Sequence, residues 1–165
     1  NPECRVTVEN SFLTEASADS LLERSYDVVV DAIDQPRNKC IIIDGCQRRS
    51  IPVITVGGAG GKCDPTAVRV EDLNKATHDA LLRRVRKMLR SDFGYPDSDT
   101  KKWGVPCVFS TESAVYPTPE GGVCDSPDTS TSLKLDCAAG FGAATFVITG
   151  FLFLAVFFNP NGSNF

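Results

Sequence analysis

Hydrophobic and polar residues in the first 61 positions alternate between two spacings, which predicts strands and helices in turn. Residues 5–8 alternate like a short strand, and residues 17–24 place alanine and leucines at helical spacing behind a serine that can cap a helix. Residues 26–33 contain three consecutive valines, the pattern of a strand buried on both faces. Pro36 opens a second predicted helix, and residues 51–56 form a third strand. This order of elements predicts an α/β fold with a parallel sheet.

The second half of the chain continues the pattern with longer irregular stretches. It predicts a strand at residues 68–70, a helix at residues 77–90 and a strand at residues 105–109. Residues 92–102 have the composition of a loop. Residues 118–133 are rich in Pro, Gly, Ser and Thr, so we expect a long mobile loop there.

Residues 138–158 carry no charge, and two interpretations follow. About twenty uncharged residues are long enough to span a membrane as a tail anchor. However, the segment holds Gly, Thr and no flanking basic cluster, and its helical part is expected to start near Gly142, which makes it short for a span. We therefore favour a buried core helix over membrane association.

Length and charge restrict the class of protein. A chain of 165 residues is about one domain and can bury a core. Its 42% hydrophobic and 23% charged residues are those of an ordinary soluble protein. The formal net charge of −4 argues against a small nucleic-acid coat protein, although it leaves room for a local basic patch.

The seven cysteines do not form a recognisable framework. Their number is odd, none stands in a C-x-x-C pair, and His78 is the one histidine, so both a disulfide scaffold and a structural zinc site are disfavoured. We expect reduced thiols. Cys137 precedes a run of small residues that can start a helix, and a helix N-terminus lowers a thiol pKa. Cys137 is therefore the candidate reactive cysteine, with a small buried hydrophobe as the alternative for this and every other cysteine.

The first candidate binding site follows the second predicted strand. Asp34 lies where that strand ends, which is the edge at which open α/β sheets bind ligands. Asp34 could hold Mg²⁺ together with phosphate oxygens, and Arg37, one turn further, could contact a phosphate. The alternative is that Asp34 caps the helix that Pro36 opens, and local sequence alone favours this cap.

A second candidate is the glycine-rich stretch at residues 57–61, followed by Lys62. It resembles a phosphate-binding loop, but Val56 and Cys63 stand where the Walker pattern needs glycine and serine or threonine. We expect a tight backbone approach here rather than phosphate binding.

A third candidate is the basic side of the helix at residues 77–90. It consists of Arg83, Arg84, Arg86, Lys87 and Arg90. Such a cluster can hold an RNA backbone through salt-dependent contacts, while the alternative is an ordinary solvated helix face.

Six stretches in a fixed order resemble one family. They are residues 1–6, 31–34, 52–61, 91–94, 107–112 and 136–145. Each is weak alone, but the ordered set resembles the tRNA threonylcarbamoyladenosine dehydratases, a branch of the ThiF/MoeB and ubiquitin-activating superfamily.

The resemblance implies ATP-dependent adenylation of the threonyl carboxylate in the modified adenosine of tRNA, followed by ring closure and a net dehydration. It matches Asp34 to an aspartate associated with magnesium and ATP, which outweighs the cap interpretation. By the same resemblance, Arg37 and Lys39 are expected to line the ATP site, the basic helix is expected to contact tRNA, and Cys137 matches a family cysteine.

The resemblance also sets the expected organisation. It implies a Rossmann-like fold of the ThiF type with a mixed sheet, whose N-terminal nucleotide-binding half is missing, so that the fragment is inactive alone. Within one domain we expect a β/α part at residues 1–61, an insert with the basic helix at 62–137, an apolar helix at 138–158 and a tail at 159–165. A homodimer in the cytoplasm is expected, and a sulfur-transfer partner has family precedent.

Two alternative functions remain at this stage. One is a ThiF/MoeB-type enzyme that adenylates a ubiquitin-like or sulfur-carrier protein, although the paired zinc cysteines typical of such enzymes are missing. The other is a non-enzymatic remnant anchored to a membrane, such as the mitochondrial outer membrane, through residues 138–158.

Overall fold

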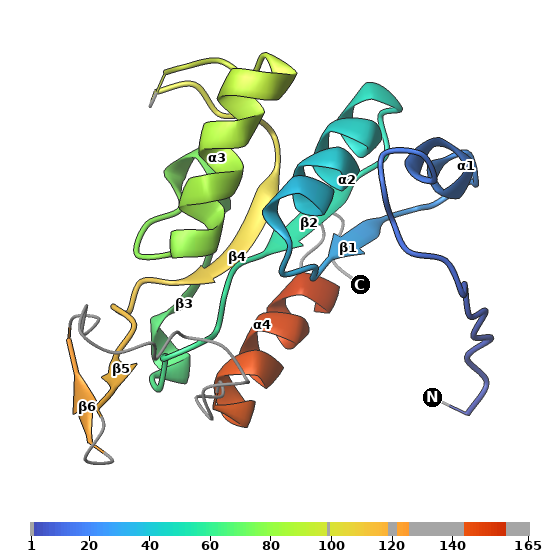
Figure 1. Cartoon of the computed structure of the whole chain (residues 1–165). Helices are drawn as coiled ribbons and strands as arrows, with labels where there is room; N and C mark the ends of the chain where they lie inside the picture. The colour runs from blue at the N-terminus through green and yellow to red at the C-terminus, as the bar shows by residue number, and fades with distance from the viewer. Residues whose placement is uncertain (1, 99, 119–121, 126–143, 158–165) are drawn as a thin grey trace.

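A four-stranded mixed sheet forms the centre of the molecule, in the order β1-β2-β4-β3 (Figure 1). The computed structural model describes residues 2–98, 100–118, 122–125 and 144–157. The strands are β1 (Val29–Asp31), β2 (Val53–Val56), β3 (Val68–Asp72) and β4 (Pro106–Ser110). The expected α/β fold with a mixed sheet is confirmed.

The strand directions bring three strand ends to one edge. β1 pairs in parallel with β2, with Val29 opposite Val53, and β2 pairs in parallel with β4, with Thr55 opposite Cys107. β3 runs antiparallel to β4. The carboxyl ends of β1, β2 and β4 therefore meet at the same edge of the sheet, which is called the carboxyl edge below.

Helices cover both faces of this sheet. α2 (Pro36–Arg48) and α3 (Ala80–Phe93) lie on one face and α4 (Thr145–Phe157) on the other, while the short α1 (Ala18–Leu22) packs against α2 (Figure 1). Two 3₁₀ turns, Pro65–Ala67 and Leu73–Lys75, flank β3.

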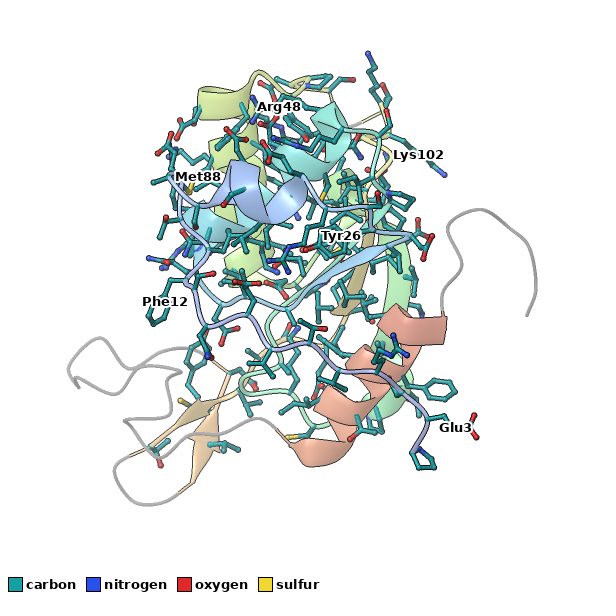
Figure 2. The ribbon with its side chains drawn as sticks, turned by 90° about the vertical axis from the view of Figure 1, so that its right-hand side faces the viewer. Glu3, Phe12, Tyr26, Arg48, Met88 and Lys102 are labelled. Carbon is teal, nitrogen blue, oxygen red and sulfur yellow. The ribbon has the colours of Figure 1, made fainter. Side chains whose placement is uncertain are left out.

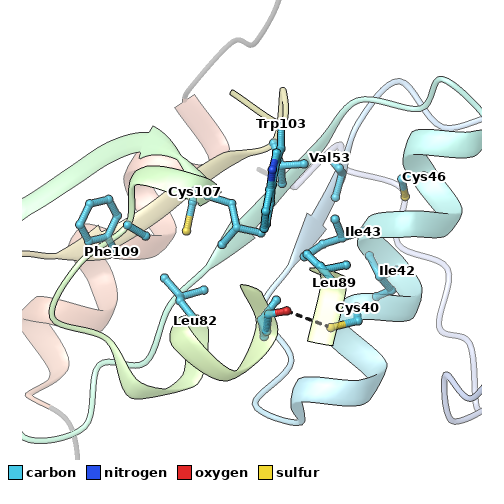
Figure 3. Close-up of a cluster of buried hydrophobic side chains, with 14 of the residues drawn as sticks. Cys40, Ile42, Ile43, Cys46, Val53, Leu82, Leu89, Trp103, Cys107 and Phe109 are labelled. Atoms are coloured by element: carbon cyan, nitrogen blue, oxygen red, sulfur yellow. Dashed lines mark hydrogen bonds between the residues drawn. The ribbon is translucent and has the colours of Figure 1, made fainter. Parts of the chain in front are cut away.

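The helix predicted behind Pro36 forms as α2, with the proline in its first turn. Cys40, Ile43 and Cys46 on its inner side are completely buried. They belong to one core cluster with Leu82 and Leu89 of α3, which Figure 3 shows in close-up. The helix therefore forms because one apolar stripe meets another.

α3 is shifted relative to the helix predicted at residues 77–90. It begins at Ala80 because the carboxylate of Asp79 accepts a hydrogen bond from the backbone N–H of Leu82, at 2.8 Å, and so caps the helix. It continues to Phe93, beyond the predicted end. There Gly94 adopts a φ of 73°, which glycine tolerates without strain, and the helix stops.

The prediction that the strand at residues 26–33 is buried on both faces is wrong. β1 is only three residues long, and Val30 is 39% exposed. It is an edge strand of the described sheet, and α4 packs against β2, β3 and β4. A run of valines identifies the strand but not its place in the sheet.

The strand predicted at residues 5–8 is also wrong. Residues 4–10 have no regular secondary structure, and Val6 and Val8 are exposed. This N-terminal segment runs along the surface, with Phe12 turned outward (Figure 2). Alternation alone does not make a strand when no neighbouring strand pairs with it in the described structure.

The predicted loop at residues 118–133 is only partly described. Tyr116–Pro117 and Val123–Cys124 pair as β5 and β6, an antiparallel ribbon, so a short strand lies inside the predicted loop. The remaining residues of that loop, at 119–121 and 126–133, lie outside the described residues.

α4 forms within the apolar segment predicted at residues 138–158, of which residues 138–143 and 158 are not described. Val147, Phe151 and Ala155, spaced four residues apart, are buried against Ile54 and Val108 of the sheet. Among the described residues, no helix is long and apolar enough to cross a membrane.

Packing of α4 on the sheet gives a direct prediction. Replacement of the buried Phe151 by alanine leaves a cavity, so Phe151→Ala should lower the free energy of unfolding by about 3–5 kcal/mol. The matched change Phe153→Ala, at a side chain that is 58% exposed, should cost less than about 1 kcal/mol. Urea unfolding of both variants measures this difference. Equal losses would contradict the described packing.

Buried thiols predict an alkaline loss of stability. Burial raises the pKa of Cys40 to about 12 and that of Cys46 to about 11, so both stay protonated in the folded chain. Because these pKa values lie above those of unfolded thiols, their contribution is intact below about pH 9 and is lost as the pH rises toward 12. Thermal unfolding between pH 8 and 11 should show this decline, and Cys40→Ala/Cys46→Ala should flatten it. An unchanged slope in that variant would assign the decline to other groups.

Candidate functional site

Three loops meet at the carboxyl edge of the sheet. They follow β1, β2 and β4 and comprise residues 32–35, 57–62 and 111–115. In open α/β sheets, this edge is where ligands bind, since the loops there are free to vary while the strands hold them in place. The sequence-predicted residues Asp34, Arg37 and Lys39 all lie at or directly behind this edge.

Asp34 is exposed in the bend between β1 and α2. The N-cap of α2 is Gln35, without a side-chain cap, so the alternative that Asp34 caps this helix is wrong. Its carboxylate thus stands in solvent beside the N-terminus of a 13-residue helix, whose positive end favours anionic groups. A carboxylate and a helix N-terminus side by side fit a metal-bound phosphate.

Arg37 lies in the first turn of α2 and is half-exposed. Its guanidinium pairs with Asp92 of α3 at 3.0 Å and with Glu15 at 3.5 Å, and it lies 5.3 Å from the centre of the Phe93 ring. Arg37 thus joins α2, the end of α3 and the N-terminal segment. A phosphate would have to compete with two exposed carboxylates for it.

Lys39 does not face the outside of the site, because its side chain is fully buried. Its ammonium donates to the carboxylate of Asp31 at 2.8 Å, to the hydroxyl of Thr55 at 3.1 Å and to the backbone carbonyl of Asp31 at 3.3 Å. These three contacts match the three protons of an ammonium. In this structure Lys39 thus has a structural role, because none of its ammonium protons is left to donate to a nucleotide.

The glycine-rich loop makes the tight approach that its sequence predicts. A Cβ atom on Gly57 would lie 2.3 Å from a carboxylate oxygen of Asp79, and the N–H of Gly58 donates to that same oxygen at 2.8 Å. Gly61 has a φ of 70° and lies against the backbone of Val115. In this structure the loop packs against Asp79, the N-cap of α3, and against Val115 in the loop after β4.

Lys62 occupies the interior at the end of this loop. Its ammonium donates to the backbone carbonyls of His78, Ser110 and Glu112 at 2.9, 3.1 and 2.8 Å, and burial lowers its pKa. Glu112 in turn accepts hydrogen bonds from the backbone N–H groups of Cys63 and Asp64. These bonds tie the loops behind β2 and β4 to the start of α3.

The predicted basic side of α3 divides into two parts. Arg83, Arg84 and Lys87 are exposed. Arg90 is half-buried, lies 5.3 Å from the centre of the Trp103 ring and donates to Asn74 at 2.8 Å. Arg86 is half-buried as well, and burial lowers its pKa. The three exposed residues are the most accessible to a partner molecule, while Arg90 is held against Trp103 and Asn74.

The cysteines give no metal site among the described residues, where no group of three or more His, Cys, Asp or Glu side chains lies close enough to hold a metal ion. Cys40, Cys46 and Cys107 are buried free thiols, as expected for small core residues. Cys137, the candidate reactive cysteine, lies outside the described residues.

A cavity lies at the other edge of the sheet, away from the three loops. It has a volume of about 560 Å³ and is lined by residues at the starts of β2 and β4, including Pro52 and Pro106. Of the sequence-predicted site residues that the structure describes, none lines this cavity. This cavity and the candidate site at the carboxyl edge therefore lie at opposite edges of the sheet.

Sequence reasoning gave no role to four side chains that hold the edge together, although three of them lie in stretches that carry the family resemblance. They are Asp31, Thr55, Asp79 and Glu112. Asp79 had a usable signal, since an aspartate directly before an apolar helical pattern is a common N-cap. Asp31 and Thr55 had none, because one polar residue at a strand end does not reveal the partner that buries it.

Comparisons with known proteins agree with this architecture. The model of the ThiF family matches residues 1–156. The tRNA threonylcarbamoyladenosine dehydratase of Escherichia coli K12 is 48% identical over 157 residues, which are 94% of this chain and 59% of that protein. The enzyme of the same name from Haemophilus influenzae is 41% identical, over 94% of this chain and 58% of its own length.

Solved structures give the same result. The structure of TcdA (CsdL) matches with a TM-score of 0.80 and 46% identity, and the match covers 94% of this chain and 57% of that one. The E. coli dehydratase in complex with ATP matches with a TM-score of 0.77 and 43% identity, over 94% and 55%. The chain thus spans less than three fifths of the relatives it matches. On the family match over residues 1–156, the chain belongs to the ThiF family.

Proposed function

We propose that this chain acts in the ATP-dependent dehydration of threonylcarbamoyladenosine in tRNA. The observation that carries the proposal is the 48% identity with the E. coli dehydratase across 94% of the chain. Another relative of that name is 41% identical over the same share. The exposed Asp34 and the helix N-terminus at the carboxyl edge supply the kind of groups that such a reaction needs.

The chemistry starts from a carboxylate, whose oxygen is a poor leaving group. Attack of that carboxylate on the α-phosphate of ATP forms an acyl adenylate and releases pyrophosphate. Attack on the acyl carbon by a group of the same modified base closes a ring and releases AMP, which carries away the carboxylate oxygen. The net change in the nucleoside is the loss of one water.

The residues of this chain would contribute position and charge rather than a covalent intermediate. Asp34 would hold Mg²⁺, and the bound ion would supply positive charge beside the phosphates. Arg37 could turn from Asp92 toward a phosphate, since both carboxylates that hold it are exposed. Lys39 would hold the end of β1 in place rather than bind a phosphate, because its ammonium already donates hydrogen bonds to Asp31 and Thr55.

The exposed basic residues of α3 are the proposed contact with the tRNA backbone. Arg83, Arg84 and Lys87 lie on a solvent-facing side of the helix whose cap, Asp79, contacts the glycine-rich loop at the carboxyl edge. RNA bound along α3 would therefore reach the edge that carries Asp34. The homodimer and the sulfur-transfer partner stay predictions.

A chimera tests the proposed activity. In it, this chain replaces the matching segment of the E. coli dehydratase, in a strain that lacks that enzyme. We expect mass spectrometry of tRNA nucleosides to show the dehydrated form restored. Only the undehydrated nucleoside, despite a folded chimera, would refute the proposal.

In the same chimera, Asp34→Asn should lower the rate of dehydration on the order of 10²-fold, because loss of one charge-stabilising group at a reaction centre costs this much. Affinity for tRNA should stay within about twofold, since the exposed helix face is unchanged. Unaltered turnover would remove Asp34 from the mechanism.

Salt dependence tests the proposed tRNA surface. Arg84→Glu and Lys87→Glu should each weaken tRNA binding and lower the slope of log affinity against log salt by about 1, because each removes a phosphate contact. Arg48→Glu is the matched control, with the same charge change at an exposed position of α2. Equal effects of all three reversals would indicate a general charge effect, and the α3 surface would then be rejected.

A further inference from the structure

A buried triad of side chains stands directly behind Asp34. Lys39 comes from α2, Asp31 from the end of β1 and Thr55 from β2, and all three are at most 1% exposed. Lys39 donates to the carboxylate of Asp31 at 2.8 Å, and the Thr55 hydroxyl donates to the same oxygen at 2.7 Å. Two donors from two elements therefore fix one oxygen of Asp31.

The second oxygen of Asp31 acts on the loop that carries Asp34. It accepts a hydrogen bond from the backbone N–H of Ile33 at 3.1 Å. This bond turns the chain immediately after β1, one residue before Asp34. The orientation of the exposed carboxylate thus depends on a carboxylate that is itself held by Lys39 and Thr55.

Stability alone is a weak reason for such an arrangement. Burial of two opposite charges costs desolvation that their attraction only partly returns, and apolar replacements of a buried pair are often equally stable. The pair does, however, confine β1, β2 and α2 to a single relative position, because each hydrogen bond demands its own geometry.

We propose that Lys39, with Asp31 and Thr55, is a positioning residue for the metal and nucleotide site at Asp34, and that it contacts neither. This rests on the proposed function. It differs from the expectation that Lys39 lines the ATP site, since Lys39 acts through the turn at residues 31–34. The triad plays the part of the outer contacts that orient metal-binding side chains in proteins.

The test uses the pair variant Asp31→Asn/Lys39→Met in the active chimera. It removes both charges, so no lone charge is left in the interior. We expect thermal unfolding close to that of the parent, weaker binding of Mg²⁺–ATP in calorimetry, a dehydration rate lower by about 10–100-fold, and unchanged affinity for tRNA. Lys102→Met, at an exposed lysine, is the control and should match the parent.

A double-mutant cycle with Asp34→Asn separates positioning from an independent role. If Lys39 acts through Asp34, the pair change should cost little once Asp34 is already replaced. Losses that multiply would show that Lys39 acts on its own, and a folded pair variant with full activity would also overturn the inference.

If the pair variant does not fold, Thr55→Val decides, because it keeps both charges and nearly the same shape while removing one hydrogen bond to Asp31. Weaker Mg²⁺–ATP binding, non-additive with Asp34→Asn, supports the inference, and unchanged binding rejects it. An inactive parent chimera would instead count against the proposed function.

Discussion

The ammonium of Lys39 imposes the strictest constraint on this structure. A charge inside a protein costs several kcal/mol unless partners satisfy it, and here the partners come from the ends of two strands. β1 and β2 must therefore pair in the observed register, and α2 must pack with its inner side toward them. Burial of the surrounding apolar residues drives the collapse of the chain. Only an arrangement in which Lys39, Asp31 and Thr55 form their hydrogen bonds avoids leaving a buried charge without a partner.

A second buried ammonium at the carboxyl edge, that of Lys62, is likewise satisfied by partners from separate segments. Three backbone carbonyls accept hydrogen bonds from it. The carboxylates of Glu112 and Asp79 accept hydrogen bonds from backbone N–H groups of the glycine-rich loop and the residues after it. The exposed groups of the edge, Asp34 above all, lie next to these polar contacts, in which the side chains of Lys39, Asp31 and Lys62 are buried. Rigidity of these contacts is what a site that works by position and charge requires.

Much of the fold could be predicted from the sequence where local signals and long-range packing agree. Pro36 and the apolar stripe behind it identify α2, and the unbroken run of β2 identifies a buried strand. The strand prediction at residues 5–8 was wrong because a strand needs a neighbouring strand, which the alternation pattern does not reveal. For the candidate site, the sequence placed Asp34 at the end of a strand, where the structure also has it. The burial of Lys39 was not predicted, since the sequence does not indicate which lysine pairs with a carboxylate inside the sheet.

Lys62 also has a consequence for the order in which the chain folds. Two of its three partners lie 48 and 50 residues further along the sequence, so the contact closes only after β3, α3 and β4 have come together. Contacts between such distant residues form only after the chain between them has closed, which slows folding. We therefore expect the Lys62 contacts to form together with the pairing of β2 and β4, which joins residues about as far apart in the sequence.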